Sequence, residues 1–61
     1  MDEFRKEIIA QALSDARVAM AIAIKEYQEL DQADPEIQDS LKHIRANVQQ
    51  AQSRFQAWRE R

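Results

Sequence analysis

Apolar residues recur along this chain of 61 residues at alternating intervals of four and three, in two separate runs. The second run is the clearer one, because nearly every residue between its members is polar: Ile37, Leu41, Ile44, Val48, Ala51, Phe55 and Trp58. The first run keeps the same intervals through Ile9, Leu13, Ala16, Met20, Ala23, Tyr27 and Leu30. Such spacing collects apolar residues on one stripe of an α-helix. The sequence therefore predicts an all-α chain with two long amphipathic helices.

Only the residues "DQAD" at 31–34 separate the two runs. A connection this short makes the two helices antiparallel neighbours. The residue numbers of the seven facing pairs then add up to 67 or 68 throughout, from Leu30 opposite Ile37 to Ile9 opposite Trp58. We expect one domain, residues 1–61, that folds as an antiparallel two-helix hairpin with heptad packing. Helix 1 is predicted over about 3–31, the turn at about 32–34 and helix 2 over about 35–60.

The start of helix 2 carries strong local signals. Asp34 is placed to cap the helix, and Pro35 is placed to occupy its first turn. Glu36 and Asp39 follow where the helix dipole favours negative charge, and Arg59 lies near the other end, where it favours positive charge. The chain has no glycine and no second proline, so neither helix contains a strong helix breaker.

The stretch "VAMAIAI" at residues 18–24 makes helix 1 apolar on more than one side. Helix 2 can cover the stripe that contains Met20 and Ala23, but a neighbouring flank of helix 1 points elsewhere. An apolar patch left exposed on a small protein usually marks an interface. We predict that this flank contacts another helical chain through Ile8, Ala12, Val18, Ala19 and Ile22.

The predicted function is a small non-enzymatic protein–protein interaction or oligomerisation module. A homodimer in the form of a four-helix bundle would cover the flank and stabilise two helices that bury little surface alone. A different helical protein, for which this chain would be a co-chaperone or an antitoxin-like partner, would cover the same flank equally well. The sequence leaves both kinds of partner open.

Residues for chemical catalysis or metal binding are scarce. The chain has no cysteine and a single histidine, His43, with Asp39 one helical turn before it. A metal site needs three or four ligands, so we expect a solvent-exposed histidine and no metal. The sequence contains no nucleophile with an adjacent base and no phosphate-binding loop. We therefore expect no enzyme, no cofactor and no small-molecule substrate.

The apolar stretch near residue 20 is too short to cross a membrane. A spanning helix needs about 20 apolar residues, and Ser14, Asp15 and Arg17 interrupt the chain just before this stretch. The N-terminal residues "MDEFRKE" are too acidic for a signal peptide. We expect a cytoplasmic protein that does not enter the membrane.

Charge is distributed unevenly, with four basic and ten acidic side chains in residues 1–39 and five basic and one acidic in residues 40–61. The acidic residues around the turn are explained by helix capping and solubility. The basic residues favour an alternative function, because cations and amides along a helix contact phosphates and bases. The side chains that would bind structured RNA are Lys42, Arg45 and Arg59.

Three short motifs resemble the Rop family of plasmid copy-number regulators: "ELD" at 29–31, "DSL" at 39–41 and "RF" at 54–55. The resemblance covers about half of the chain. It implies a helical hairpin that dimerises into an antiparallel bundle and binds paired RNA loops through the outer face of its first helix. Acidic residues flank that outer row here, which consists of Phe4, Gln11, Val18 and Lys25. The resemblance supports the hairpin, and a small dimeric Rop-like regulator is the alternative function.

Overall fold

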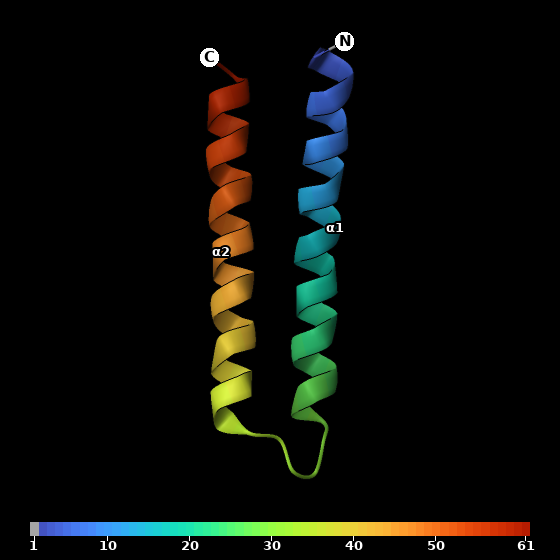
Figure 1. The fold of residues 1–61 in the computed structure, drawn as a ribbon, viewed down its shortest axis with the longest axis vertical. Helices are drawn as coiled ribbons and strands as arrows, with labels where there is room; N and C mark the ends of the chain where they lie inside the picture. The colour runs from blue at the N-terminus through green and yellow to red at the C-terminus, as the bar shows by residue number, and fades with distance from the viewer. Residues whose placement is uncertain (1) are drawn as a thin grey trace.

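The structure is a computed structural model that describes residues 2–61, and it consists of two α-helices joined by one turn. α1 spans Asp2–Gln28 and α2 spans Pro35–Arg59. The helices run antiparallel and side by side, so the two ends of the described chain lie together, opposite the turn (Figure 1). The hairpin is thin and elongated, with extents of 47 × 16 × 11 Å. The predicted all-α hairpin is confirmed for the described residues.

α1 begins at Asp2 and ends at Gln28, before the predicted end near residue 31. The backbone N–H groups of Glu29 and Leu30 donate to the carbonyl groups of Glu26 and Tyr27, at 3.2 and 3.1 Å. These bonds span three residues and tighten the end of the helix, as is common at helix termini. The chain then reverses over residues 29–34, and α2 begins at Pro35 and ends at Arg59.

Tyr27 and Asp34 fasten the turn. The carboxylate of Asp34 accepts a hydrogen bond from the backbone N–H of Glu36 at 2.8 Å, which caps α2. The backbone N–H of Asp34 donates to the hydroxyl oxygen of Tyr27, also at 2.8 Å. This second bond ties the end of α1 to the start of α2. No residue among 2–61 has a positive φ angle, so the reversal needs no left-handed backbone.

Part of the predicted seam forms the contact between the helices. Its half-buried members are Leu13, Ala16, Met20, Ala23 and Tyr27 of α1 and Leu41, Val48 and Phe55 of α2. Ile24 is the single buried residue of the described chain, with 5% of its surface exposed. The hairpin therefore has a line of contact rather than a core that encloses side chains.

The rest of the predicted seam is exposed, which corrects the prediction that all seven layers close within one hairpin. Ala51 is exposed, and exposure is between 44% and 57% for Ile9, Leu30, Ile37, Ile44 and Trp58. In α2, each of these exposed seam residues is directly followed by a half-buried polar residue. These polar residues are Gln38, Arg45, Gln52 and Arg59. Two helices touch along one line only, and long side chains can lay their aliphatic stems across that line while their polar ends reach solvent.

Candidate interaction surfaces

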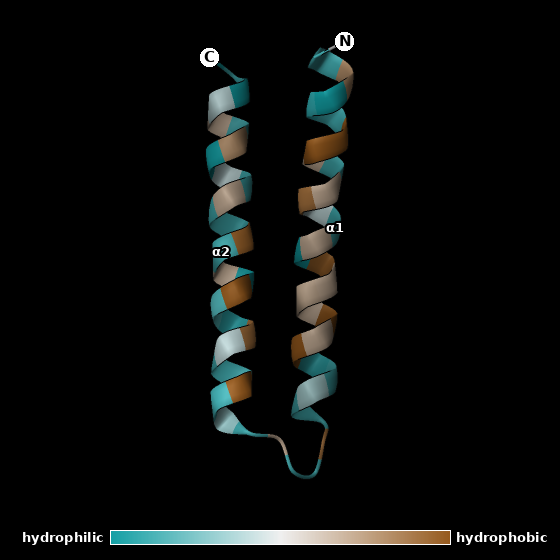
Figure 2. Cartoon of the chain, viewed as in Figure 1, coloured by the Kyte–Doolittle hydropathy of each residue, from teal (hydrophilic) through white to brown (hydrophobic). Residues whose placement is uncertain are grey.

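The exposed part of the seam lies on one face of the hairpin. In each helix, an exposed seam residue directly precedes a residue on the side that contacts the other helix, as Ile44 precedes Arg45 in α2. The exposed seam residues of both helices point to the same side of the hairpin, because antiparallel helices turn in opposite senses when both are viewed from the same end. We call this surface the seam face, and it consists of the exposed Ile9, Ile37, Ile44, Ala51 and Trp58 together with the half-buried Ala16 and Ala23 of α1. None of these residues is polar, and hydrophobic segments recur along both helices (Figure 2).

Trp58 lies at the open end of the seam face, in a hollow of about 210 Å³ that α1 and α2 line together. Ile9 lines the same hollow, which agrees with one shared face for the exposed rows of the two helices. The indole stacks on the ring of Phe55 with the ring centroids 5.6 Å apart. The ammonium group of Lys6 lies 5.4 Å from the centroid of the Trp58 ring. The indole is thus held between the helices and still 53% exposed.

The flank predicted from the sequence lies on the outer side of α1, and we call it the α1 flank. Its residues Val18 and Ile22 also line a hollow together with residues of α2. All of its predicted residues are exposed: Ile8, Ala12, Val18, Ala19 and Ile22. Asp15 lies on the same stripe, seven residues after Ile8 and seven before Ile22. Its carboxylate accepts a hydrogen bond from the side-chain amide of Gln11 at 2.9 Å. The α1 flank is therefore apolar toward both ends and negatively charged in the middle.

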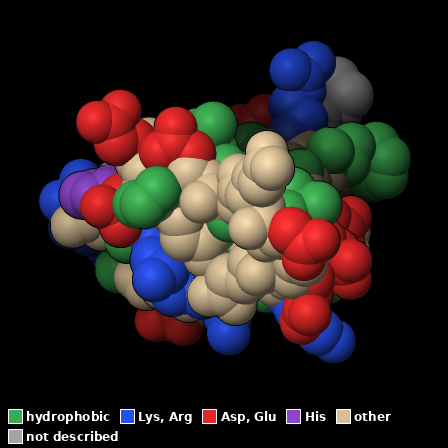
Figure 3. Space-filling view, turned by 90° about the horizontal axis from the view of Figure 1, so that it is seen from below, with side chains coloured by type: hydrophobic (Ala, Val, Ile, Leu, Met, Phe, Trp, Pro, Cys, Tyr) green, Lys and Arg blue, Asp and Glu red, His purple; other side chains and the backbone are tan. Residues whose placement is uncertain are grey.

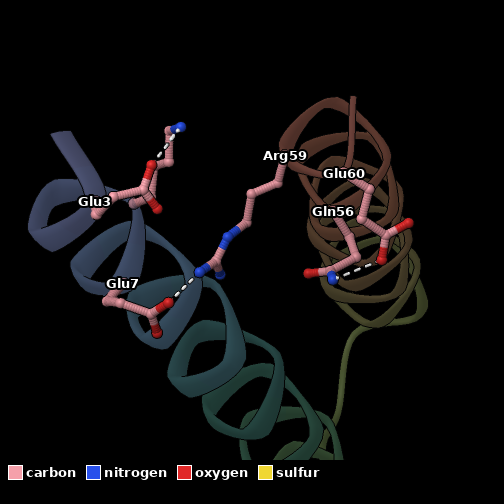
Figure 4. A network of polar contacts seen from close by, with 6 residues as sticks. Glu3, Glu7, Gln56, Arg59 and Glu60 are labelled. Atoms are coloured by element: carbon pink, nitrogen blue, oxygen red, sulfur yellow. Dashed lines mark hydrogen bonds and ion pairs between the residues drawn. The ribbon is translucent and has the colours of Figure 1, made fainter.

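The residues predicted for RNA binding belong to the side opposite the seam face, which we call the polar face. Arg59 reaches from α2 to α1 and forms an ion pair with Glu7 (Figure 4). Arg45 is half-buried, whereas Lys42 is exposed. A hollow of about 350 Å³ on this face is lined by Arg17, Val18, Ala21, Ile22, Arg45 and Gln49. The carboxylate of Glu7 neutralises part of the positive charge within the hairpin itself.

Acidic side chains gather at the end of the molecule that holds the turn (Figure 3). Residues 25–42 contain six acidic and two basic side chains, a net charge of −4. At the open end, residues 2–7 and 54–61 together contain four acidic and five basic side chains, a net charge of +1. The net charges at the two ends of the hairpin therefore have opposite signs.

His43 and Asp39 are both exposed on α2. Among residues 2–61, no three histidine, aspartate or glutamate side chains are grouped in a way that could hold a metal ion. Neither helix of this described part is both long and apolar enough to span a bilayer.

Two features were not predicted by the apolar spacing. The spacing assigns Tyr27 to the seam, whereas the structure shows that its hydroxyl group also fastens the turn. Gln38 sits beside Ile37 on the contact side, and its amide nitrogen and oxygen are buried without a hydrogen-bond partner. Buried amide groups normally have partners. The signal that could have indicated Gln38 is its place three residues before Leu41, on the same helical face.

Comparison with known proteins finds no matching family model, no matching curated protein and no matching solved structure. The function of the hairpin is therefore inferred from its own surfaces: the seam face, the α1 flank with the carboxylate of Asp15 on its stripe, and the polar face.

Proposed function

We propose that the chain is a small non-enzymatic protein–protein interaction or oligomerisation module, whose exposed apolar surface is covered by another helical chain. The supporting observation is the contrast between exposed and buried apolar side chains. Ile24 alone is buried, whereas nine large apolar side chains are between 44% and 71% exposed. Single exposed apolar residues are common on proteins, but contiguous apolar patches on a small protein are typical of interfaces.

The proposed assembly is a four-helix bundle. A chain of this length buries a smaller share of its surface than a larger domain does, and it has no disulfide to compensate. A second pair of helices packed on the hairpin would enclose the half-buried residues in a common core. The bundle thus supplies the stability that a single pair of helices lacks.

The mass of the purified chain in solution tests this proposal. One chain has a mass of 7.2 kDa, and we expect light scattering to report twice that value. Because dimerisation follows mass action, the measurement should cover about 5 to 200 µM protein. A chain that is monomeric at every concentration and captures no protein from its source cells would contradict the proposal.

We propose the α1 flank as the contact surface for a helical partner of different sequence. A two-fold contact between two copies that pairs Ile8 with Ile22 would also place Asp15 against Asp15 of the second copy, and opposed like charges are unfavourable. A partner helix with a lysine or arginine opposite Asp15 avoids this repulsion. Proteins captured by the wild type should be lost with Ile22→Arg, and equal capture by the two forms would contradict this assignment.

The second candidate function is binding of structured RNA by the polar face. Arg17 of α1 and Arg45 and Gln49 of α2 line one hollow there, so cations and an amide from both helices converge. Such binding should weaken with salt and with neutralisation of Lys42, Arg45 and Arg59. No detectable RNA binding at low salt would remove this candidate.

A further inference from the structure

We propose that the hollow on the polar face binds a small organic anion, in which a carboxylate, sulfonate or phosphate group is attached to an apolar ring or short chain. This hollow of about 350 Å³, which we call the arginine hollow, is lined by Arg17, Val18, Ala21, Ile22, Arg45 and Gln49. The inference goes beyond the proposed function, because RNA binding would use the cations of this hollow and leave its apolar side without a role.

The arginine hollow has the size and the mixed lining of a ligand site. Pockets that bind small molecules measure about 300 to 1,000 Å³, and they combine an apolar lining with a few polar groups that converge. The apolar side is formed by α1 through Val18, Ala21 and Ile22. The polar groups are two guanidinium groups and one amide, from Arg17, Arg45 and Gln49. A ligand that contacts both sides therefore has an apolar part and an anionic part.

The two arginines of the hollow are not occupied by carboxylates. Within residues 2–61, Lys6 and Arg59 form ion pairs, whereas Arg17 and Arg45 form none. Arg17 donates to the neutral amide oxygen of Gln52 at 3.4 Å, which is long for a hydrogen bond. None of the six lining residues is acidic. Guanidinium groups bind carboxylate, sulfonate and phosphate oxygens through charged hydrogen bonds, so an anion in the hollow would meet two cations and no competing carboxylate.

Arg45 and Gln49 are assigned to the anionic group of the ligand. Arg45 is half-buried, whereas Arg17 is exposed, so the side chain of Arg45 has less freedom to lose when a ligand binds. Gln49 follows Arg45 by one helical turn and lies on the same side of α2. Its amide can donate to an anion held by Arg45, and Arg17 supplies the second positive charge from α1.

The apolar part of the ligand is assigned to α1. Val18 and Ile22 are 58% and 57% exposed, and Ala21 lies beside them with a side chain of a single methyl group. An apolar ring placed over Ala21 would remove surface of both larger side chains from water, which favours binding. The small side chain at position 21 leaves the room that the ring needs.

The arginine hollow stays accessible in the proposed bundle. It belongs to the polar face, opposite the seam face, so helices packed on the seam face leave it open. Val18 and Ile22 are shared with the α1 flank, so a partner helix on that flank would compete with the ligand. The purified full chain, without a flank partner, is therefore the form in which the ligand site is tested.

Naphthalene-2-sulfonate is the test ligand, because it joins an anionic group to an apolar ring. Amide NMR signals of the labelled chain should shift along one saturable curve, with the largest shifts at residues 17–22 and 45–49. At ordinary ligand efficiency, an anion of about 14 non-hydrogen atoms binds with a Kd on the order of 1 mM. Shifts that do not saturate, or that are largest beside Trp58 in the other hollow between the helices, would overturn the inference.

Two comparison ligands separate the anionic part from the apolar part. Sodium sulfate lacks the ring and naphthalene-2-methanol lacks the charge, so each should bind at least about tenfold more weakly than naphthalene-2-sulfonate. Equal binding of sulfate would mean that the apolar side plays no part. Equal binding of the neutral alcohol would mean that the arginines play none. Either result would overturn the inference.

Two matched pairs of substitutions locate the site. Arg45→Gln should raise the Kd about tenfold, whereas Arg54→Gln removes an exposed arginine of α2 outside the hollow and should change it less than about twofold. Ala21→Leu fills the hollow and should abolish saturable binding, whereas Ala57→Leu makes the same exchange at an exposed position of α2 outside it and should have no effect.

Glutamine and leucine are good helix formers, so all four variants should remain helical, which far-UV circular dichroism checks. An equal loss of binding in a variant and its control would place the ligand elsewhere and overturn the inference. If Ala21→Leu failed to fold, the arginine pair and the comparison ligands would still decide it. The mass of the wild type by light scattering is measured without ligand, so the proposed function and this inference can fail separately.

Discussion

Replacing Tyr27 with phenylalanine should weaken the turn without changing the helix packing. The variant keeps the half-buried ring and removes only the hydroxyl oxygen, which accepts the backbone N–H of Asp34 at 2.8 Å. Asp34 is exposed, so water can replace the lost acceptor. The expected cost is therefore the net value of one hydrogen bond, about 0.5 to 1 kcal/mol, rather than the larger penalty of a buried unpaired donor. For a chain of this size the loss corresponds to a Tm lower by about 2 to 8 °C.

Urea unfolding followed by far-UV circular dichroism measures this effect. All samples must have the same protein concentration, because self-association adds to the apparent stability. Ser40→Ala is the matched control, since it also removes a hydroxyl group that forms a hydrogen bond, here to the carbonyl of Glu36 at 3.0 Å. Alanine favours the helix and offsets that loss, so the control should be neutral or slightly stabilised. An unchanged free energy of unfolding in Tyr27→Phe, or an equal loss in both variants, would refute the role given to the Tyr27 hydroxyl.

Four further substitutions should change the urea midpoint in ways that the structure explains. Ile24→Ala removes the single buried side chain and should cost about 2 to 3 kcal/mol, the low part of the usual range, because solvent lies close on a hairpin this thin; a cost below that of Tyr27→Phe would contradict the contact line. Asp34→Ala removes the cap of α2 and should cost about 1 kcal/mol, and no loss would mean that the cap is redundant. Gln38→Leu should raise stability by about 1 kcal/mol by removing two buried polar atoms without partners, whereas a loss would show that the amide is satisfied. Glu7→Gln breaks the ion pair between the exposed Glu7 and the half-buried Arg59 and should cost no more than about 0.5 kcal/mol, a difference that should vanish in high salt.

The helices and their antiparallel arrangement could be predicted because the signals are local. Intervals of four and three residues specify a helical stripe, and Asp34 with Pro35 specifies where the second helix starts. The short connection then leaves one arrangement for the pair. These predictions need no knowledge of which distant side chains meet, so the structure agrees with them.

The rotation of each helix about its own axis could not be predicted. The apolar residues of a helix include all those that it buries against any neighbour, whereas in a hairpin each helix has only one neighbour. Leu41 and Ile44 satisfy the pattern equally, yet one is half-buried and the other is exposed. The half-buried positions of α2 also include Arg45 and Gln52. The amide oxygen of Gln52 accepts a hydrogen bond from Arg17 of α1 at 3.4 Å, which is a tertiary contact that the apolar pattern does not contain. The ion pair between Glu7 and Arg59 escapes prediction for the same reason, since 52 residues separate its partners.

The reversal of the chain uses no positive φ angle at any residue from 2 to 61. No described position therefore requires glycine for its backbone conformation, and the turn relies on side-chain bonds from Tyr27 and Asp34 instead. The architecture is specified by the regular spacing of apolar and polar positions together with a few capping contacts. Two chains with few identical residues could keep that spacing and share this shape, and a designer could replace most of the outer residues without disturbing the backbone.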